Sequence, residues 1–504
     1  MGTEVSHASL PTELWYPIIY MLPSLDQKTC LSVSKIFHDI AATSVFSHVT
    51  ISLGFWRPFE FESEYDDLAT EEKAAMKRQA NTSYDVLRHI MRTPDFAKKV
   101  KKLSVRAFAN AGEEMQIAIR FLADALEALP DLRAFVWHGS SPVISTEILQ
   151  ALVSFASSTL QELSIPPELP EGSDTLLPLL NHVRSFSIMD RDFVPDEKEC
   201  PVIRAAINAN ADPLRSVCLT GDIWAQLPPL SRFAHLDELE FICLETYDEL
   251  GTLFAHCSRL RAFALVYAEQ DLIPVLAAYP HALPNLDSFK LWGIDYTGDD
   301  VAVLAEFLRP KRRLRRLDVM VRVDTPGWVT NDARVCPVLL PLLEIMPALP
   351  DLHVVGLSFR VREVQEVHIR DLQAYLPRNL TALLVWTDVT STPIPAKHWT
   401  DLFAAYKSLR YLHIVPDYYD VLELQEHIFQ DPPPNIELFG YGAQIHPMRR
   451  ESTIGPAVLY PRWPYPKVYF RTADDYGDED WEWLLRHHGY DEDEHFMHNA
   501  DAFR

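Results

Sequence analysis

A short apolar phrase recurs along this chain of 504 residues and constrains its fold more than any other feature. The phrase has the form L-x-x-L-x-L, where L stands for any apolar residue. Ala-Leu-Pro precedes it at 128–130, 282–284 and 348–350. It occurs twelve times clearly and a thirteenth time marginally, with first residues running from Val100 to Ile436. These first residues are 28 positions apart on average, because 336 residues are crossed in twelve steps.

Each phrase predicts a strand that follows a helix. The last two apolar residues alternate, so both point to one side of a strand. The proline before them ends the preceding helix, because it has no amide proton to continue the ladder. One unit cannot bury its own apolar face, but stacked units share a core. We therefore expect a curved α/β solenoid over 98–445, with parallel strands on the concave side and helices on the convex side. An ordinary α/β domain of similar spacing is the alternative.

Composition excludes several classes of function. The chain has 71 acidic and 46 basic residues, a net charge of −25, which disfavours nucleic acid and anionic membranes as partners. Its six scattered cysteines form no C-x-x-C pair and are typical of reduced thiols in the cytoplasm or nucleus. The N-terminus lacks the features of a signal peptide, and no apolar run is long enough to span a membrane. Phosphate-binding glycine motifs are absent, so we expect no cofactor.

The first fifty residues predict three short helices. Leu14, Ile18 and Leu22 recur at intervals of four, on one face of a helix. Because Pro17 would break a helix begun at Thr12, we expect a turn first and then a helix entered at Pro17. Two further apolar helices follow before residue 41. Three helices of this size make a poor core alone and indicate a segment that is completed by a neighbour or a partner.

These residues resemble the F-box, at Leu10, Pro11, Glu13, Leu14, Ile18, Leu22, Leu31, Val33, Ser34, Lys35 and Phe37. The repeats resemble the helix-backed intracellular variety of the leucine-rich repeat family, although the asparagine or cysteine after each strand is mostly missing. The resemblance implies an all-α module at 1–53 that docks the Skp-type linker subunit of a cullin–RING ubiquitin ligase. A helical connector at 54–97 would join it to the repeats. The alternative is a helical cap that closes the open end of the solenoid.

The concave face of the later repeats offers candidate binding residues. Side chains flanking the two strand leucines face this surface in the expected register. The apolar candidates are Trp292, Met320, Leu384, Trp386, Tyr411 and Val415, and the polar ones are Lys290, Arg316, Asp318 and His413. Aromatic and Met clusters on an exposed face are typical of binding surfaces, so we expect a protein substrate here. The alternative is that the C-terminal segment, or the loop around Trp328, folds over these side chains and buries them.

Two further segments carry unusual charge. Residues 446–504 are rich in proline and aromatics and then in acid around Trp481 and Trp483, which indicates a solvated tail with an aromatic anchor on the last repeat. A metal site is disfavoured there, because His487, His488, His495 and His498 have no cysteine nearby. The basic run at 311–316 could meet an acidic or phosphorylated partner, or be solvated or neutralise acid on adjacent turns.

We therefore expect a non-catalytic substrate-recognition subunit of an SCF-type ubiquitin ligase in the cytoplasm or nucleus. Its partners would be the linker subunit, through it a cullin, and a protein substrate. A leucine-rich-repeat scaffold with a helical N-terminal cap and no link to ubiquitin is the second hypothesis. An enzyme is the third and is disfavoured, because no nucleophile–base motif or cofactor fingerprint occurs and we assign no catalytic or metal-binding residue.

Overall fold

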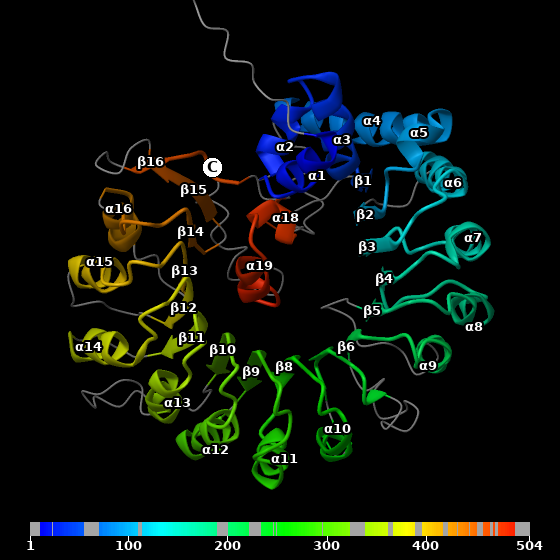
Figure 1. Ribbon diagram of the computed structural model, residues 1–504. Coiled ribbons are helices and arrows are strands. Elements are labelled where there is room, and N and C mark those ends of the chain that lie inside the picture. Colours follow the sequence, from blue (N-terminus) through cyan, green and yellow to red (C-terminus); the bar gives the residue numbers. More distant parts are fainter. Residues whose placement is uncertain are drawn as a thin grey trace, which may run out of the picture. The chain divides into compact units, whose positions relative to one another are not determined.

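The structure is a computed structural model (Figure 1). The chain divides into two compact units, Met1–Arg184 and Ser185–Arg504. The described residues are 11–22, 24–54, 70–108, 113–188, 200–220, 233–244, 246–247, 249–294, 296–322, 338–360, 366–388, 396–416, 422–430, 432–442, 444–450, 457–463, 467–468 and 472–488.

The first unit begins with helices and continues as alternating strands and helices. Its four strands are parallel and paired in the order β1-β2-β3 and β3-β4. The elements are α1 (Thr12–Tyr20), α2 (Ser24–Cys30), α3 (Lys35–Val45), β1 (His48–Gly54), α4 (Thr70–Arg92), α5 (Pro94–Ala97), β2 (Lys102–Phe108), α6 (Glu113–Glu127), β3 (Ala134–Ser141), α7 (Thr146–Ala151), η2 (Leu152–Ala156), β4 (Glu162–Ile165), α8 (Ser173–Leu176) and η3 (Leu177–Leu179).

The second unit repeats strand and helix through most of its length. Its strands follow one another in chain order, parallel from β5 to β14 and antiparallel for β15 and β16. The elements are β5 (Ser185–Ile188), α9 (Cys200–Ala209), β6 (Ser216–Thr220), β7 (Glu238–Ile242), α10 (Leu250–His256), β8 (Ala262–Ala268), α11 (Leu272–Ala278), β9 (Ser288–Ile294), α12 (Gly298–Leu308), β10 (Arg316–Arg322), α13 (Leu340–Ile345), η6 (Met346–Ala348), β11 (Val354–Arg360), α14 (Glu366–Tyr375), β12 (Ala382–Asp388), α15 (Ala396–Ala404), β13 (Tyr411–Pro416), α16 (Leu422–Gln430), β14 (Leu438–Tyr441), β15 (Gln444–Arg450), β16 (Ala457–Leu459), α18 (Ala473–Tyr476) and α19 (Glu479–Leu485).

The repeat phrase sets the register of these strands. In β10, Leu317 pairs with Phe289 of β9, and Val319 pairs with Leu291. All four side chains are fully buried between the sheet and the helices. Strands β6 to β13 line the inner side of the second unit, and helices α9 to α16 cover its outer side (Figure 1). The α/β solenoid with parallel strands inside and helices outside is therefore confirmed.

The N-terminal helix differs from the expectation at Pro17. α1 begins at Thr12 and continues through Pro17, so the predicted entry at Pro17 is wrong. Proline removes one bond of the helix ladder, but side chains of α1 on both sides of Pro17 pack on the small core of the three helices. The rings of Trp15 and Phe37 lie 4.7 Å apart, and Ile19 is buried between α1 and α3. We infer that this packing outweighs the lost bond.

We predict that Leu317→Ala lowers the free energy of unfolding of the second unit by about 2–5 kcal/mol, because it leaves a cavity in a core that cannot fully collapse. Urea denaturation followed by far-ultraviolet circular dichroism measures the change. Leu459→Ala is the control, since Leu459 lies in the same unit, is 36% exposed and should change the free energy of unfolding far less. Equal small effects for both variants would contradict the assignment of Leu317 to the core.

Candidate functional site

All ten predicted substrate-binding residues meet on the inner face of β9 to β13. The central row runs across the strands from Lys290 to Asp318, Gly356, Leu384 and His413, each beside the next. The row before it contains Ser288, Arg316, Val354, Ala382 and Tyr411, and the row after it contains Trp292, Met320, Ser358, Trp386 and Val415. The structure therefore brings the candidates together as the register predicts.

This surface is covered by the protein's own C-terminal segment, residues 472–488. α19 lies against β10, β11 and β12 and contributes four apolar side chains, Trp481, Trp483, Leu484 and Leu485, all buried (Figure 1). They form one cluster with Met320, Leu384, Trp386, Tyr411 and Val415, and Trp292 packs against it. The expectation of a solvent-exposed concave surface is wrong here, because the C-terminal segment buries it, as the alternative stated.

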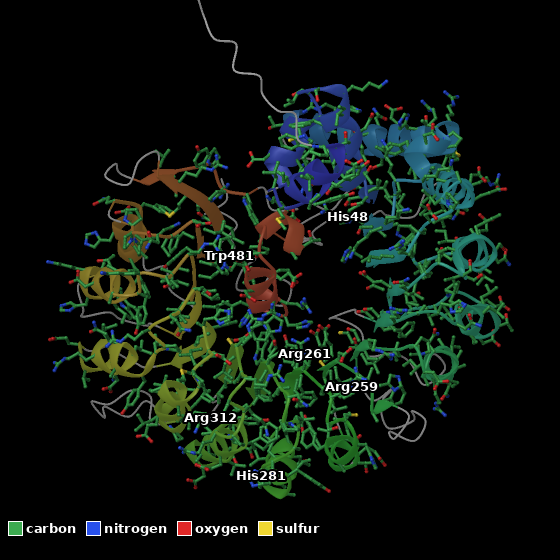
Figure 2. All side chains as sticks on the ribbon, in the orientation of Figure 1. His48, Arg259, Arg261, His281, Arg312 and Trp481 are labelled. Carbon is green, nitrogen blue, oxygen red and sulfur yellow. The ribbon has the colours of Figure 1, made fainter. Side chains whose placement is uncertain are left out.

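Aromatic rings supply much of this contact. The ring centroid of Trp481 lies 5.5 Å from that of Tyr411, and the ring centroid of Tyr476 of α18 lies 5.9 Å from the same Tyr411 ring. Figure 2 labels Trp481 in the region of α19, on the inner side of the second unit. On the other side of the surface, Trp292 contacts Trp386 at 5.7 Å and stacks near His488 at 6.1 Å. Ring pairs at these separations add stability beyond the burial of their area.

A buried charge cluster lies at the centre of the contact. Asp318 Oδ2 accepts from Lys290 Nζ at 2.6 Å and lies 2.6 Å from His488 Nε2. The same ammonium donates to the carbonyls of Leu484 at 3.1 Å and Arg486 at 2.7 Å, at the C-terminal end of α19. Burial alone would raise the pKa of Asp318, but the charges of His488 and Lys290 outweigh it and lower the pKa to about 2.

Glycine makes room for this arrangement. A Cβ at Gly356 would collide with the carboxylate of Asp318 and approach Leu484 Cδ1 at 3.1 Å. The neighbouring strand therefore needs a residue without a side chain where the carboxylate and the leucine meet.

Ion pairs also surround the buried centre. Asp480 lies 2.6 Å from Arg316 and 3.3 Å from His353, and Asp478 lies 3.5 Å from Arg410. Burial opposes ionisation of Asp480, but hydrogen bonds from His353 and Arg316 lower its pKa to about 2. The acids at the start of α19 thus face Arg316 on β10 and two basic side chains, His353 and Arg410, that directly precede β11 and β13.

A second, largely buried carboxylate anchors the end of the segment. Glu240 on β7 lies 2.8 Å from Arg486 and 3.0 Å from His487. Burial would raise the pKa of Glu240, but the Arg486 and His487 charges hold it well below its usual range. Sequence reasoning missed Glu240, His353 and Arg410. Glu240 occupies an inward position of β7, which the strand register could have identified. The basic residues directly after α19 could have indicated that this segment needs an acidic partner.

Tyr411 and His413 also bind each other, and His413 contacts the backbone at Gly442. His413 Nε2 lies 2.9 Å from the carbonyl of Gly442, and its Nδ1 lies 2.8 Å from Tyr411 Oη. The carbonyl can only accept, so Nε2 donates and Nδ1 accepts from the tyrosine. His413 is buried and holds the end of the sheet together rather than facing solvent.

The basic run at 311–316 is divided among internal contacts. Lys311 is buried and donates to the carbonyls of Pro280 and Ala282, and Arg312 donates to the carbonyl of Ala348. Arg316 pairs with Asp480. The partners of Lys311 and Arg312 are thus backbone carbonyls, and the acid that Arg316 neutralises lies in the C-terminal segment and not on an adjacent turn.

The N-terminal helices divide the predicted linker-binding residues into two groups. Leu22, Leu31 and Phe37 are half-buried and pack on the small core of α1 to α3. Leu14, Ile18 and Val33 are 49%, 40% and 60% exposed. Pro11 and Glu13 are also exposed, and Leu10 lies outside the described residues.

More apolar side chains extend this exposed group. Ile36 is 50% exposed and Met21 84% exposed, and Tyr16 and Tyr20 are also exposed on α1. We call Leu14, Ile18, Met21, Val33 and Ile36 the N-terminal apolar face. Groups of exposed large hydrophobic residues are typical of surfaces that a partner covers.

Within the described part of the chain, no helix is long and apolar enough to cross a bilayer. The same residues contain no group of three or more His, Cys, Asp or Glu side chains placed to hold a metal ion. His495 and His498 lie outside the described residues.

Comparison with known proteins shows likeness only to solved structures. No family model matches the chain, and no curated protein matches it. One similar structure is the complex of Rad7 and Elc1 in yeast, with 14% identity, a TM-score of 0.42, and coverage of 86% of this chain and 92% of that one. Another is the leucine-rich repeat protein LegL7 from Legionella pneumophila, with 12% identity, a TM-score of 0.32, and coverage of 59% and 87%. A third is a TLR13–ssRNA13 complex, with 14% identity, a TM-score of 0.31, and coverage of 70% and 54%.

The strand order, the register and the helix-covered outer side define the class: this is a leucine-rich-repeat solenoid. What it binds has to be inferred from its own residues.

We predict that Asp318→Asn lowers the free energy of unfolding by about 3–5 kcal/mol, because Lys290 then loses the charge that compensates its burial. Chemical denaturation near neutral pH measures the change. Glu306→Gln makes the same acid-to-amide change in an exposed pair with Arg309 and should leave the midpoint unchanged within error. A neutral Asp318→Asn would show that the buried cluster contributes nothing to stability.

We also predict a pH-dependent contribution from His353. Its hydrogen bond to Asp480 raises its pKa above the ordinary value, against the opposing effects of burial and Arg315. The stabilisation is therefore complete below about pH 6.5 and is lost as the pH rises through the raised value. The difference in unfolding free energy between wild type and His353→Gln should shrink from about pH 5.5 to about pH 8.5. A difference that stays constant over this interval would contradict the assignment.

Proposed function

We propose that the chain is a substrate-recognition subunit of an SCF-type cullin–RING ubiquitin ligase, with α1 to α3 docking the Skp-type linker and the repeats holding a protein substrate. The observation that carries the proposal is the N-terminal apolar face. Its side chains are exposed although the helices have a small buried core of their own at Ile19, Cys30, Ile40 and Ala41. A linker subunit would remove this face from water.

Three of the five residues of this face are also positions at which the sequence resembles an F-box. Leu14, Ile18 and Val33 are F-box positions and point outward, whereas Leu22, Leu31 and Phe37 support the module from within. The proposed role needs no catalytic residue. The subunit acts by proximity, because a substrate held on the repeats meets the transferred ubiquitin at a raised effective concentration.

A scaffold without a ubiquitin link is the second candidate, and one observation favours it. β1 follows α3 after two residues and pairs with β2 along seven positions, from His48 with Lys102 to Gly54 with Phe108. In the first unit the helices thus directly precede the first paired strand, which is where a cap of an open sheet end belongs. A cap and a docking module differ in whether the N-terminal apolar face has a partner.

We predict that the triple variant Leu14→Asp, Ile18→Asp and Val33→Asp abolishes co-purification with a co-expressed Skp-type linker. Each anchor contributes on the order of 2 kcal/mol, so the affinity should fall at least about 100-fold in isothermal calorimetry. The thermal midpoint should change little, because these side chains are exposed.

The control variant carries Ile117→Asp and Leu179→Asp, which are similarly exposed apolar positions outside this face. It should bind the linker normally. A folded wild-type protein that captures no linker would exclude the ubiquitin-ligase role and leave the scaffold.

A further inference from the structure

The C-terminal segment shows which chemistry the inner face accepts. Its apolar residues, spaced as Trp-x-Trp-Leu-Leu, lie on the aromatic and aliphatic surface of β10 to β13. Its acids, Asp478 and Asp480, meet Arg410, Arg316 and His353. The surface therefore combines an apolar floor with a basic border at one end, while its carboxylates Asp318 and Glu240 meet the basic residues at the other end of the segment.

Cations and rings are also paired across the contact. The guanidinium of Arg316 lies 5.8 Å from the Trp483 ring, and that of Arg410 lies 5.2 Å from the Trp481 ring. Lys290 lies 4.8 Å from the Trp483 ring while it binds the carbonyls at the end of α19. A cation near an aromatic face favours Trp over other aromatics. The positions of Lys290, Arg316 and Arg410 therefore favour a helical turn with two tryptophans and flanking acidic residues.

Residues 472–488 are attached to the inner face by side-chain contacts, whereas each repeat is attached to the next by backbone hydrogen bonds of the sheet. α18 has four residues and α19 has seven, lengths at which isolated helices do not persist in water. Neither adds a strand to the sheet, and the contacts described above run through side chains and two carbonyl groups. Detaching the segment therefore leaves the ladder of β9 to β13 intact, whereas removing a repeat would break it.

We propose that the inner face of β9 to β13 binds a short acidic, tryptophan-containing helical peptide of a partner protein, and that residues 472–488 are the intramolecular occupant which this peptide displaces. The inference rests on the proposed function, since it names the class of substrate that the repeats would receive. It involves none of the residues of the N-terminal apolar face, so the two proposals fail separately.

The test uses a fluorescein-labelled synthetic peptide with the sequence of residues 472–488 and three full-length proteins. In wild type the attached segment competes at a high effective concentration, so anisotropy should show weak binding. In Trp481→Ala/Trp483→Ala the attached segment is weakened, and the peptide should bind at least about 10-fold more tightly. Adding Arg316→Asp to that double variant should remove most of the gain, because the peptide loses its partner for Asp480.

A compensating peptide makes the result specific. A peptide that carries Asp480→Arg should bind the Arg316→Asp triple variant better than the unmodified peptide does, and should bind the double variant worse. No binding to a folded double variant would overturn the proposal, because the segment would then be permanent core. A wild-type dimer in light scattering that dissociates on addition of peptide would also overturn it, since the occupant would be a second copy's segment.

Hydrogen exchange of the wild-type chain covers the case in which the double variant does not fold. Amides of 479–486 should exchange through a local opening, with less protection than those of β9 to β13. Equal protection of the segment and the strands would show that they unfold only together and would overturn the proposal.

Discussion

The constraint on which the second unit depends is that every other residue of each inner strand must be buried under the outer helices. Leu317 and Val319 fill that layer in β10, and the same positions are filled in the paired strands. A strand cannot shift by one residue without moving this apolar set to the opposite face. The register therefore fixes which side chains face inward, and so it places Lys290 beside Asp318 and Trp292 beside Met320.

The inward residues include a large apolar group, and the C-terminal segment removes this group from water. The burial of Leu484 and Leu485 contributes about 2 kcal/mol each. The cluster of Lys290, Asp318 and His488 costs desolvation, which its close hydrogen bonds offset. Hydrophobic burial therefore supplies much of the affinity, while the charges determine which segment fits and in which direction its helix runs.

The sequence predicted the solenoid, the strand register and the membership of the inner surface, because all three follow from a period of two within a repeat of 28. It left open whether the surface is exposed or covered by the C-terminal segment. Contacts such as that of Asp480 with Arg316 join residues 164 positions apart, and no periodic pattern encodes them. The helix through Pro17 was also missed, because packing of Trp15 on Phe37 overrode a local preference.

The two apolar surfaces of the chain differ in exposure: one is covered and the other is open to solvent. The inner face of β9 to β13 has an occupant within the same chain, and that occupant matches it in charge and in ring placement. The N-terminal apolar face leaves Leu14, Ile18 and Val33 exposed. Under the two proposals above, the open surface would hold a constitutive partner and the covered surface a regulated one. A recognition subunit of the proposed kind would need this division, because it would stay attached to its assembly and bind a substrate only when the substrate displaces the C-terminal segment.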